Sequence, residues 1–337
     1  MAETPPPIFH GGNLAAASAR FGKPDGGWLD LSTGINPFSY PLPPLDMESW
    51  TRLPDAAAEA ALIAAARRRY NASNAEIVAA AGSQTLIQRL AELRSPGRVA
   101  IVSPAYAEHA RCWAAAGHEV VAFDGRELPR GADVCIVVNP NNPDGRVIAR
   151  GTLASFYERL AVRGGVLIVD EAFADVAPQI SIADWAGQPG LVVLRSFGKF
   201  FGLAGLRLGF ALTDQQTAAR LGEALGPWAV SGPALEIGRR ALTDDDWAEA
   251  MRRRLKDAAQ GLDDMLAEHG LKVRGGTHLF RLVETADAAR LHAALAGNGV
   301  WTRIFDHTPD WLRIGLPGGE AAIARLARAL DRAFTGS

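Results

Sequence analysis

The stretch Ser196-Phe197-Gly198-Lys199-Phe200-Phe201-Gly202-Leu203-Ala204-Gly205-Leu206-Arg207 lies between two short apolar runs. These runs, Leu191–Leu194 and Leu208–Leu212, predict two buried strands. The segment between them is mostly apolar or glycine and holds a single lysine, Lys199. A lysine amine becomes a nucleophile where its surroundings disfavour the charged form, as Schiff-base lysines require. A surface loop with a solvated lysine is less favoured, because few of its neighbours are polar.

Upstream of this stretch, strand-like and helix-like segments alternate. Short apolar runs predict strands at 77–80, 99–102, 119–123, 134–138 and 166–169. Longer periodic segments predict helices at 56–70, 83–93, 106–117 and 152–162. This alternation predicts an α/β fold with a mostly parallel central sheet and helices on both faces. Ligands of such sheets bind beyond the carboxyl ends of the strands.

The two ends of the chain have other patterns. Residues 1–50 are rich in proline and largely irregular, so we expect an N-terminal arm that packs on a small domain. After three helices that end near residue 269, the chain alternates short strands, one of them at 300–304, with two helices. We therefore expect an arm at 1–50, a large domain at 51–238 that binds a cofactor, and a small C-terminal α/β domain at 239–337.

The central stretch resembles the cofactor-lysine segment of class I and II aminotransferases, which use pyridoxal 5'-phosphate (PLP). The matching residues are Ser196, Lys199 three residues later, and Arg207 eight residues after the lysine. The resemblance implies the PLP-dependent transferase fold (fold type I), with a large and a small domain. It implies that Lys199 is catalytic and forms a Schiff base with PLP, while Ser196 and Arg207 bind the cofactor phosphate. A guanidinium suits a phosphate because its fork of donors can bind two oxygens.

Residues near two predicted strand ends extend this candidate cofactor site. Gly82, Ser83 and Gln84 would open a helix whose first backbone N–H groups can bind an anion. Ser83 acting as a simple helix cap is the alternative. Tyr106 follows a strand, and its ring could stack on a pyridine ring. A tyrosine of the hydrophobic core is the alternative there.

Two further motifs fit the same resemblance. The segment Asn139–Gly145 is dense in turn residues, and a turn alone would explain it. The resemblance implies that Asn142 binds the cofactor's ring hydroxyl and contacts the substrate. It also implies that Asp170 is catalytic and keeps the pyridine nitrogen protonated, which makes the ring a stronger electron sink. The alternative for Asp170 is a cap of the following turn. Phe173 stands where many relatives carry tyrosine, so this chain lacks that hydroxyl.

Two arginines suggest a binding site for an anionic substrate. Arg313 lies in the otherwise apolar run 311–315. Burying a guanidinium without a partner is unfavourable, so we expect an anion beside it. The resemblance implies that Arg313 binds the substrate's α-carboxylate. Arg303, on the preceding predicted strand, is a second candidate, with an ion pair inside the protein as its alternative.

Two subfamilies share these features. Histidinol-phosphate aminotransferases have the short length and both arginines. Threonine-phosphate decarboxylases of the cobalamin pathway have these, the His-Gly-Gly-Asn found here at 10–13, and the Asp-Glu-Ala-Phe found at 170–173. The stronger resemblance is to the decarboxylases. It implies PLP-dependent decarboxylation of O-phospho-L-threonine to (R)-1-aminopropan-2-yl phosphate, with His10, Gly11 and Gly34 among the substrate-binding residues. A histidinol-phosphate-type aminotransferase is the alternative.

The composition disfavours several other classes. The net charge of -2 gives no case for nucleic acid or an anionic membrane. No apolar run approaches the roughly 18 residues that span a bilayer. The two cysteines, Cys112 and Cys135, form no disulfide framework, so we expect a reducing, cytoplasmic location and no metal.

The resemblance also implies a homodimer. Leu53 replaces a tyrosine that in related enzymes reaches the neighbouring subunit's cofactor. A PLP-binding sensor domain without catalysis is a remote alternative. It is disfavoured because no helix-turn-helix pattern precedes the expected arm and the chain has no basic face.

Overall fold

The computed structural model describes residues 11–335 and consists of two compact units. Unit 1 comprises Met1–Pro37 and Lys256–Ser337, and unit 2 comprises Phe38–Leu255. These limits lie at other residues than the boundaries expected after residues 50 and 238. The expected division into an arm, a large domain and a small domain stays a prediction.

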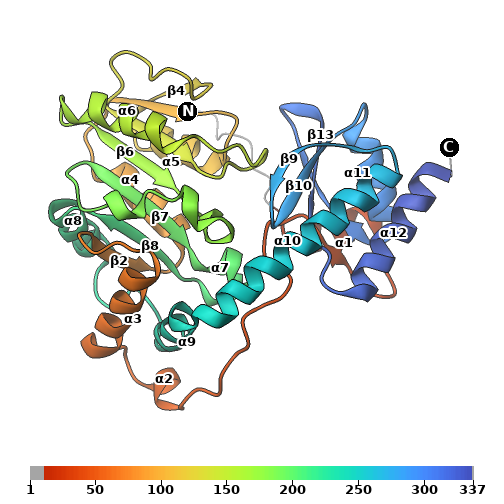
Figure 1. Cartoon of the computed structure of the whole chain (residues 1–337), viewed down its shortest axis with the longest axis horizontal. Helices are drawn as coiled ribbons and strands as arrows, with labels where there is room; N and C mark the ends of the chain where they lie inside the picture. The colour runs from red at the N-terminus through yellow and green to blue at the C-terminus, as the bar shows by residue number, and fades with distance from the viewer. Residues whose placement is uncertain (1–10, 336–337) are drawn as a thin grey trace. The chain divides into compact units, whose positions relative to one another are not determined.

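Unit 2 is built on a seven-stranded sheet. Its strands are β2 (Glu76–Ala80), β3 (Arg98–Val102), β4 (Glu119–Phe123), β5 (Val134–Val138), β6 (Val166–Asp170), β7 (Leu191–Ser196) and β8 (Gly209–Thr213). Their order across the sheet is β2-β8-β7-β6-β5-β3-β4. Neighbours from β7 to β4 are parallel, and β8 is antiparallel to both of its neighbours. The mostly parallel α/β sheet is therefore confirmed, and Figure 1 shows β6, β7 and β8 side by side.

Helices cover both faces of this sheet. The chain leaves β3 through α5 (Ala107–Ala115) towards one edge, and it leaves β5 through α6 (Arg150–Ala161) towards the other. Right-handed connections therefore put α5 and α6 on opposite faces. The α5 face also carries α4 (Ser83–Glu92) and α8 (Gln215–Leu225), whose buried side chains pack on alternate strand residues such as Val134 and Ile136.

The other helices of unit 2 lie before the sheet in the chain, after it, or, in one case, between β7 and β8. They are α2 (Glu48–Thr51), α3 (Ala56–Arg69), the short α7 (Phe197–Phe200), α9 (Gly232–Thr243) and α10 (Asp245–Glu268), which continues into unit 1. The segment around α2 loops out beyond α3 and α9 in Figure 1. It exposes four large apolar side chains, each between 64 and 67 % exposed: Leu42, Met47, Trp50 and Leu53.

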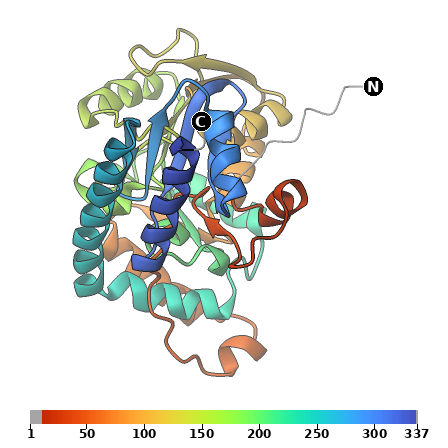
Figure 2. The ribbon, with the colours of Figure 1, turned by 90° about the vertical axis from the view of Figure 1, so that its right-hand side faces the viewer.

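Unit 1 combines two small sheets with helices. The short strands β1 (Leu29–Asp30) and β11 (Val300–Trp301) pair in parallel. An antiparallel sheet has the order β12 (Arg303–Phe305), β13 (Thr308–Gly315), β10 (Phe280–Glu284), β9 (Lys272–Thr277). The helices are α1 (Leu14–Phe21), α11 (Ala288–Gly297) and α12 (Glu320–Thr335). Figure 2 shows α11 and α12 side by side.

The single strand predicted at 300–304 is wrong. The chain divides there into β11 and β12, which belong to different sheets. The residue between them, Thr302, is buried, and its hydroxyl lies 2.8 Å from Nδ1 of His292 on α11. The break in the ladder therefore coincides with a side chain that bonds a helix.

Candidate active site

The carboxyl edge of the unit 2 sheet holds a pocket of about 150 Å³. All of the predicted cofactor residues except Gly82 line it. The lining residues are Ser83, Gln84, Tyr106, Val138, Asn142, Asp170, Ala172, Phe173, Ser196, Lys199 and Arg207. Because β8 is antiparallel to the others, its start lies at this edge, which brings Arg207 beside residues that follow the parallel strands.

One end of this pocket is a cradle of backbone and guanidinium groups. Gly82 is the N-cap of α4, with a φ of 86°, and no side chain caps the helix, so Ser83 is not the cap. A Cβ on Gly82 would lie 2.4 Å from Nη2 of Arg207, and one on Gly209 would lie 2.3 Å from the backbone nitrogen of Ser83. The positive φ of Gly82 and the backbone contact of Gly209 require glycine. The close approach of Gly82 to Arg207 places a cation beside the first N–H groups of α4, as anion binding requires.

Lys199 lies on α7, between buried phenylalanines. Phe197 and Phe200 are almost fully buried and hold this short helix in place. The Nζ of Lys199 lies 5.6 Å from the centre of the Phe173 ring, within the range of a cation–π contact. Because Lys199 lines the pocket, a solvated lysine in a surface loop does not describe it.

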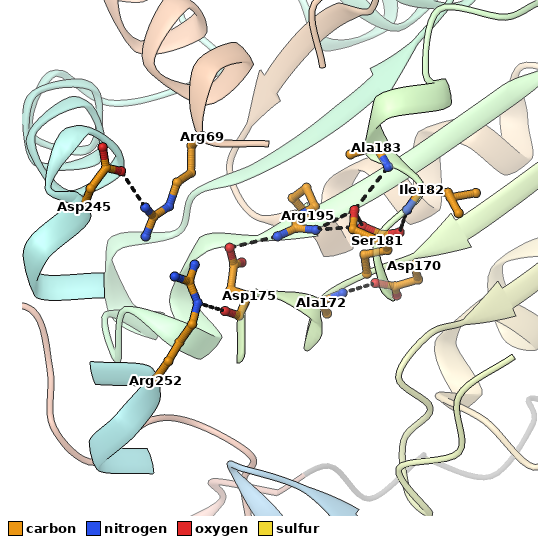
Figure 3. Close-up of polar contacts among 11 residues, drawn as sticks. Arg69, Asp170, Ala172, Asp175, Ser181, Ile182, Ala183, Arg195, Asp245 and Arg252 are labelled. Atoms are coloured by element: carbon orange, nitrogen blue, oxygen red, sulfur yellow. Dashed lines mark hydrogen bonds and ion pairs between the residues drawn. The ribbon is translucent and has the colours of Figure 1, made fainter. Parts of the chain in front are cut away.

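Asp170 ends β6 and is buried. Its Oδ1 accepts a hydrogen bond from the backbone nitrogen of Ala172 at 3.0 Å, as Figure 3 shows. Its Oδ2 lies 2.9 Å from Nε2 of His109. One carboxylate oxygen therefore caps the turn, as the alternative interpretation expected, and the other is oriented by a buried histidine.

A buried ion cluster fixes the segment that follows β6. The guanidinium of Arg195 lies 2.7 Å from Glu171 and 2.8 Å from Asp175, and all three side chains are buried. Its centre lies 4.3 Å from the centre of the Tyr70 ring. Figure 3 shows Arg195 between Asp175 on one side and Ser181 on the other. This cluster ties the residues after β6 to the neighbouring strand β7.

The asparagines of Asn139–Gly145 have different tasks. Asn139 exchanges two hydrogen bonds with the backbone of Ile148. Asn141 donates to the carbonyl of Pro104 at 2.8 Å and to Asp144 at 2.7 Å. A turn explains these two residues, whereas Asn142 lines the pocket.

The ring of Tyr106 borders the pocket and not only the core. Its hydroxyl donates to Oε1 of Gln84 at 3.1 Å, and its ring meets the ring of His109 edge-on. Burial, together with the charges of Glu108 and Asp170, raises the pKa of Tyr106 to about 12. The hydroxyl therefore keeps its proton and acts as a donor at neutral pH.

In unit 1, predicted substrate residues lie around the backbone of Ser32. The backbone nitrogen of Gly12 donates to the Ser32 hydroxyl at 2.7 Å, and a Cβ on Gly11 would lie 2.4 Å from the Ser32 carbonyl oxygen. Arg313 donates to that carbonyl at 2.6 Å. Gly34 follows two residues later and is buried. Three of the predicted residues thus lie on one segment or contact it.

Arg303 and Arg313 face one another across β12 and β13. Like charges in this arrangement destabilise a sheet unless an anion offsets them. Burial and the charge of Arg303 lower the pKa of Arg313 to about 10. His10, which was also predicted to bind substrate, lies outside the described residues.

Sequence reasoning missed His109, Glu108 and the Arg195 cluster. His109 had a detectable signal, because it follows Tyr106 by three residues at the start of a helix, and that spacing brings two side chains together. Arg195 had none, because it directly follows an apolar run and its partners come from the segment after another strand.

The chain matches the family model described as "Aminotransferase class I and II" over residues 28–330. It belongs to this family. Two similar proteins are named threonine-phosphate decarboxylase. The one from Pseudomonas aeruginosa is 47% identical over 96% of this chain and 97% of its own length. The one from Sinorhizobium sp is 45% identical over 97% and 98%.

The fold is also found in a solved structure, a histidinol-phosphate aminotransferase from Sinorhizobium meliloti in complex with pyridoxal-5'-phosphate. The TM-score is 0.82 at 20% identity, with 100% of this chain and 98% of that chain covered. The fold class predicted from the sequence is confirmed. Within residues 11–335, no helix is long and apolar enough to cross a membrane. Across that range, no three His, Cys, Asp or Glu side chains lie together as a metal site requires.

Proposed function

We propose that this protein is a PLP-dependent carboxy-lyase that converts O-phospho-L-threonine to (R)-1-aminopropan-2-yl phosphate and CO₂ in cobalamin synthesis. The observation that carries this proposal is the near-full-length identity of 47% and 45% to two threonine-phosphate decarboxylases. A pocket that combines a lysine, a buried carboxylate and an anion cradle adds support.

The residues of this pocket fit PLP. Ser83, Ser196, Arg207 and the first N–H groups of α4 would hold its phosphate, since a Cβ on Gly82 would fill the cradle. Tyr106 would stack on the ring, and Asn142 would donate to its hydroxyl. When bound, PLP withdraws electrons from the substrate's Cα, which allows the bond to the carboxylate to break.

Two residues would do the chemistry that the chain supplies. Lys199 would anchor the cofactor, release it to the substrate amine, and deliver a proton to Cα after CO₂ has left. Asp170 would keep a proton on the cofactor's ring nitrogen, and its contacts with His109 and Ala172 would hold it in one orientation. The substrate thus loses CO₂ and gains one proton at Cα.

The substrate carries a carboxylate and a phosphate, so its binding site needs cations and N–H donors. Arg313 would bind the carboxylate, assisted by Arg303. Burial, then the charge of Arg303, lowers the pKa of Arg313, and the charge of Asp30 offsets only part of this. His10 and the backbone of Gly11 and Gly34 would supply further donors. The contact of Gly11 with Ser32, whose carbonyl accepts from Arg313, supports this group.

Product analysis tests the proposed reaction. The purified protein would be incubated with PLP and O-phospho-L-threonine, and in parallel with histidinol phosphate plus 2-oxoglutarate. CO₂ and aminopropanol phosphate from the first mixture are expected. Glutamate from the second mixture alone would instead identify an aminotransferase. Neither product, with PLP bound, would contradict the proposed reaction and point to another substrate, such as unphosphorylated threonine, or to a binding domain without catalysis.

The proposal includes a cytoplasmic homodimer. The two free cysteines suit a reducing compartment, and the exposed side chains of Leu42, Met47, Trp50 and Leu53 suit a second copy of the chain. Light scattering at micromolar concentration should give twice the mass of the chain. Trp50→Asp should shift the protein towards monomer, and a monomer in the unchanged protein would contradict the proposal.

A further inference from the structure

A row of hydrogen-bonded side chains leads from the pocket to the surface. Tyr106 donates to Oε1 of Gln84 at 3.1 Å, and Nε2 of Gln84 donates to Glu108 at 2.8 Å. Glu108 also accepts from Nε of Arg111 at 3.0 Å. The row starts at the pocket with Tyr106 and ends at Arg111, whose side chain is half-exposed.

The Glu108 carboxylate determines which way the Gln84 amide points. A carboxylate only accepts hydrogen bonds, so Gln84 must turn its NH₂ group to Glu108 and its oxygen to the Tyr106 hydroxyl. Glu108 is only 3% exposed, so water cannot easily replace these donors. Without the donors from Gln84 and Arg111, the buried Glu108 carboxylate would lose its hydrogen bonds, which is unfavourable. The orientation of the Gln84 amide is therefore well determined.

We propose that Glu108 is a positioning residue: through the Gln84 amide it fixes the plane of the Tyr106 ring that borders the cofactor pocket. The inference rests on the proposed function, because a fixed ring matters where PLP lies beside it. Gln84 then has two roles. Its backbone N–H is part of the anion cradle, and its side chain joins Glu108 to Tyr106 in a row of hydrogen bonds that we call the brace. The ring of Tyr106 also meets His109, so the brace supports the histidine that orients Asp170.

The first test needs no cofactor. The chain has four tyrosines, so a protein labelled with 3-fluorotyrosine gives few ¹⁹F NMR resonances. The Tyr106 resonance is the one lost in Tyr106→Phe. In Glu108→Gln it should change position and width while the other resonances stay. An unchanged Tyr106 resonance in a folded Glu108→Gln protein would overturn the proposal.

Two further variants make this test specific. Gln84→Met removes the amide that joins Tyr106 to Glu108 and should change the same resonance. This keeps the test valid if Glu108→Gln does not fold. Glu92→Gln removes an exposed carboxylate on the same helix as Gln84, where it bonds Arg89. It should leave the Tyr106 resonance and PLP binding as they are.

The second test is a double-mutant cycle in which PLP binding is measured by visible circular dichroism. Glu108→Gln should weaken PLP binding about threefold to tenfold, the effect of one hydrogen bond. In the Tyr106→Phe background, which keeps the ring but lacks the hydroxyl, the same change should have less than about a twofold effect. Equal effects in both backgrounds would overturn the proposal. If the unchanged protein does not bind PLP either, the proposed function fails. The ¹⁹F spectra still decide whether Glu108 and Gln84 hold the Tyr106 ring.

Discussion

Two buried arginines of this protein have opposite electrostatic surroundings. Arg195 in unit 2 lies between Glu171 and Asp175, whereas Arg313 in unit 1 donates to a backbone carbonyl and faces Arg303. Burial lowers the pKa of Arg195, but its two carboxylates outweigh burial and raise the pKa above the usual arginine value. Burial and Arg303 lower the pKa of Arg313 to about 10. Burial alone therefore does not fix the direction of an arginine's pKa shift, because the charges that face the guanidinium decide it.

The largest expected effect would break the structural side of this comparison. Arg195→Leu leaves Glu171 and Asp175 buried without their cation, which costs about 3–5 kcal/mol. Denaturant unfolding should show this loss, or the protein should not accumulate in folded form. A folded Arg195→Leu protein with unchanged stability would show that the cluster does not support the fold.

Asp170 should respond differently from its neighbour Glu171, although both are buried. Asp170→Ala should lower kcat about 10²–10⁴-fold, the range found when a group that controls a proton is removed. Its far-UV circular dichroism should stay that of the folded protein. Near-normal turnover would refute the role of Asp170 at the cofactor ring. Glu171→Ala should instead lower the free energy of unfolding, because Arg195 loses a partner.

Arg313→Met tests the other arginine of the comparison, which is proposed to bind the substrate. The methionine removes a buried charge that faces another cation, but it also removes the hydrogen bond to the Ser32 carbonyl, so the free energy of unfolding should fall by less than in Arg195→Leu. KM for O-phospho-L-threonine should rise about tenfold to a hundredfold, the worth of a charged hydrogen bond. Steady-state kinetics and denaturation of one preparation check both statements. An unchanged KM would put the carboxylate site elsewhere.

The last prediction concerns pH and the charge of Arg303. Burial, then the charges of Arg20 and Arg303, lower the pKa of His292 from 6.5 to about 4. Between these values the unfolded chain binds a proton that the folded protein does not. The contribution of the neutral His292 to the free energy of unfolding is therefore complete above about pH 6.5. It falls towards pH 4 by at most about 1.4 kcal/mol per pH unit. His292→Leu should flatten this slope, and an unchanged slope in that variant would contradict the assignment.

The pocket of unit 2 could be predicted from the sequence because each of its residues adjoins a recognisable pattern. Asn142 and Asp170 follow or end apolar runs, and the carboxyl ends of parallel strands meet at one edge. The runs at 119–123 and 134–138 have the bounds of β4 and β5. The helix expected at 56–70 is α3, which ends one residue earlier.

Residues whose tasks depend on tertiary contacts could not be predicted in this way. Asp170 and His109 are 61 residues apart, and Glu108 and Gln84 are 24 apart. No local pattern couples residues at such separations. Arg303 and Arg313 face one another because of the register of the hairpin formed by β12 and β13. The sequence interpretation had merged the first strand of that hairpin, β12, with β11.

Unit 2 is one continuous stretch of chain, whereas unit 1 joins a stretch near each end. The strand β1 can pair only after β11 has been made, and Gly315, whose backbone nitrogen donates to the carbonyl of Leu31, comes later still. Because domains fold as units during synthesis, unit 2 can form before β11 and Gly315, the partners of residues 11–34, have been synthesised. The residues proposed to hold the cofactor therefore come together first on the ribosome, and those proposed to select the substrate come together last.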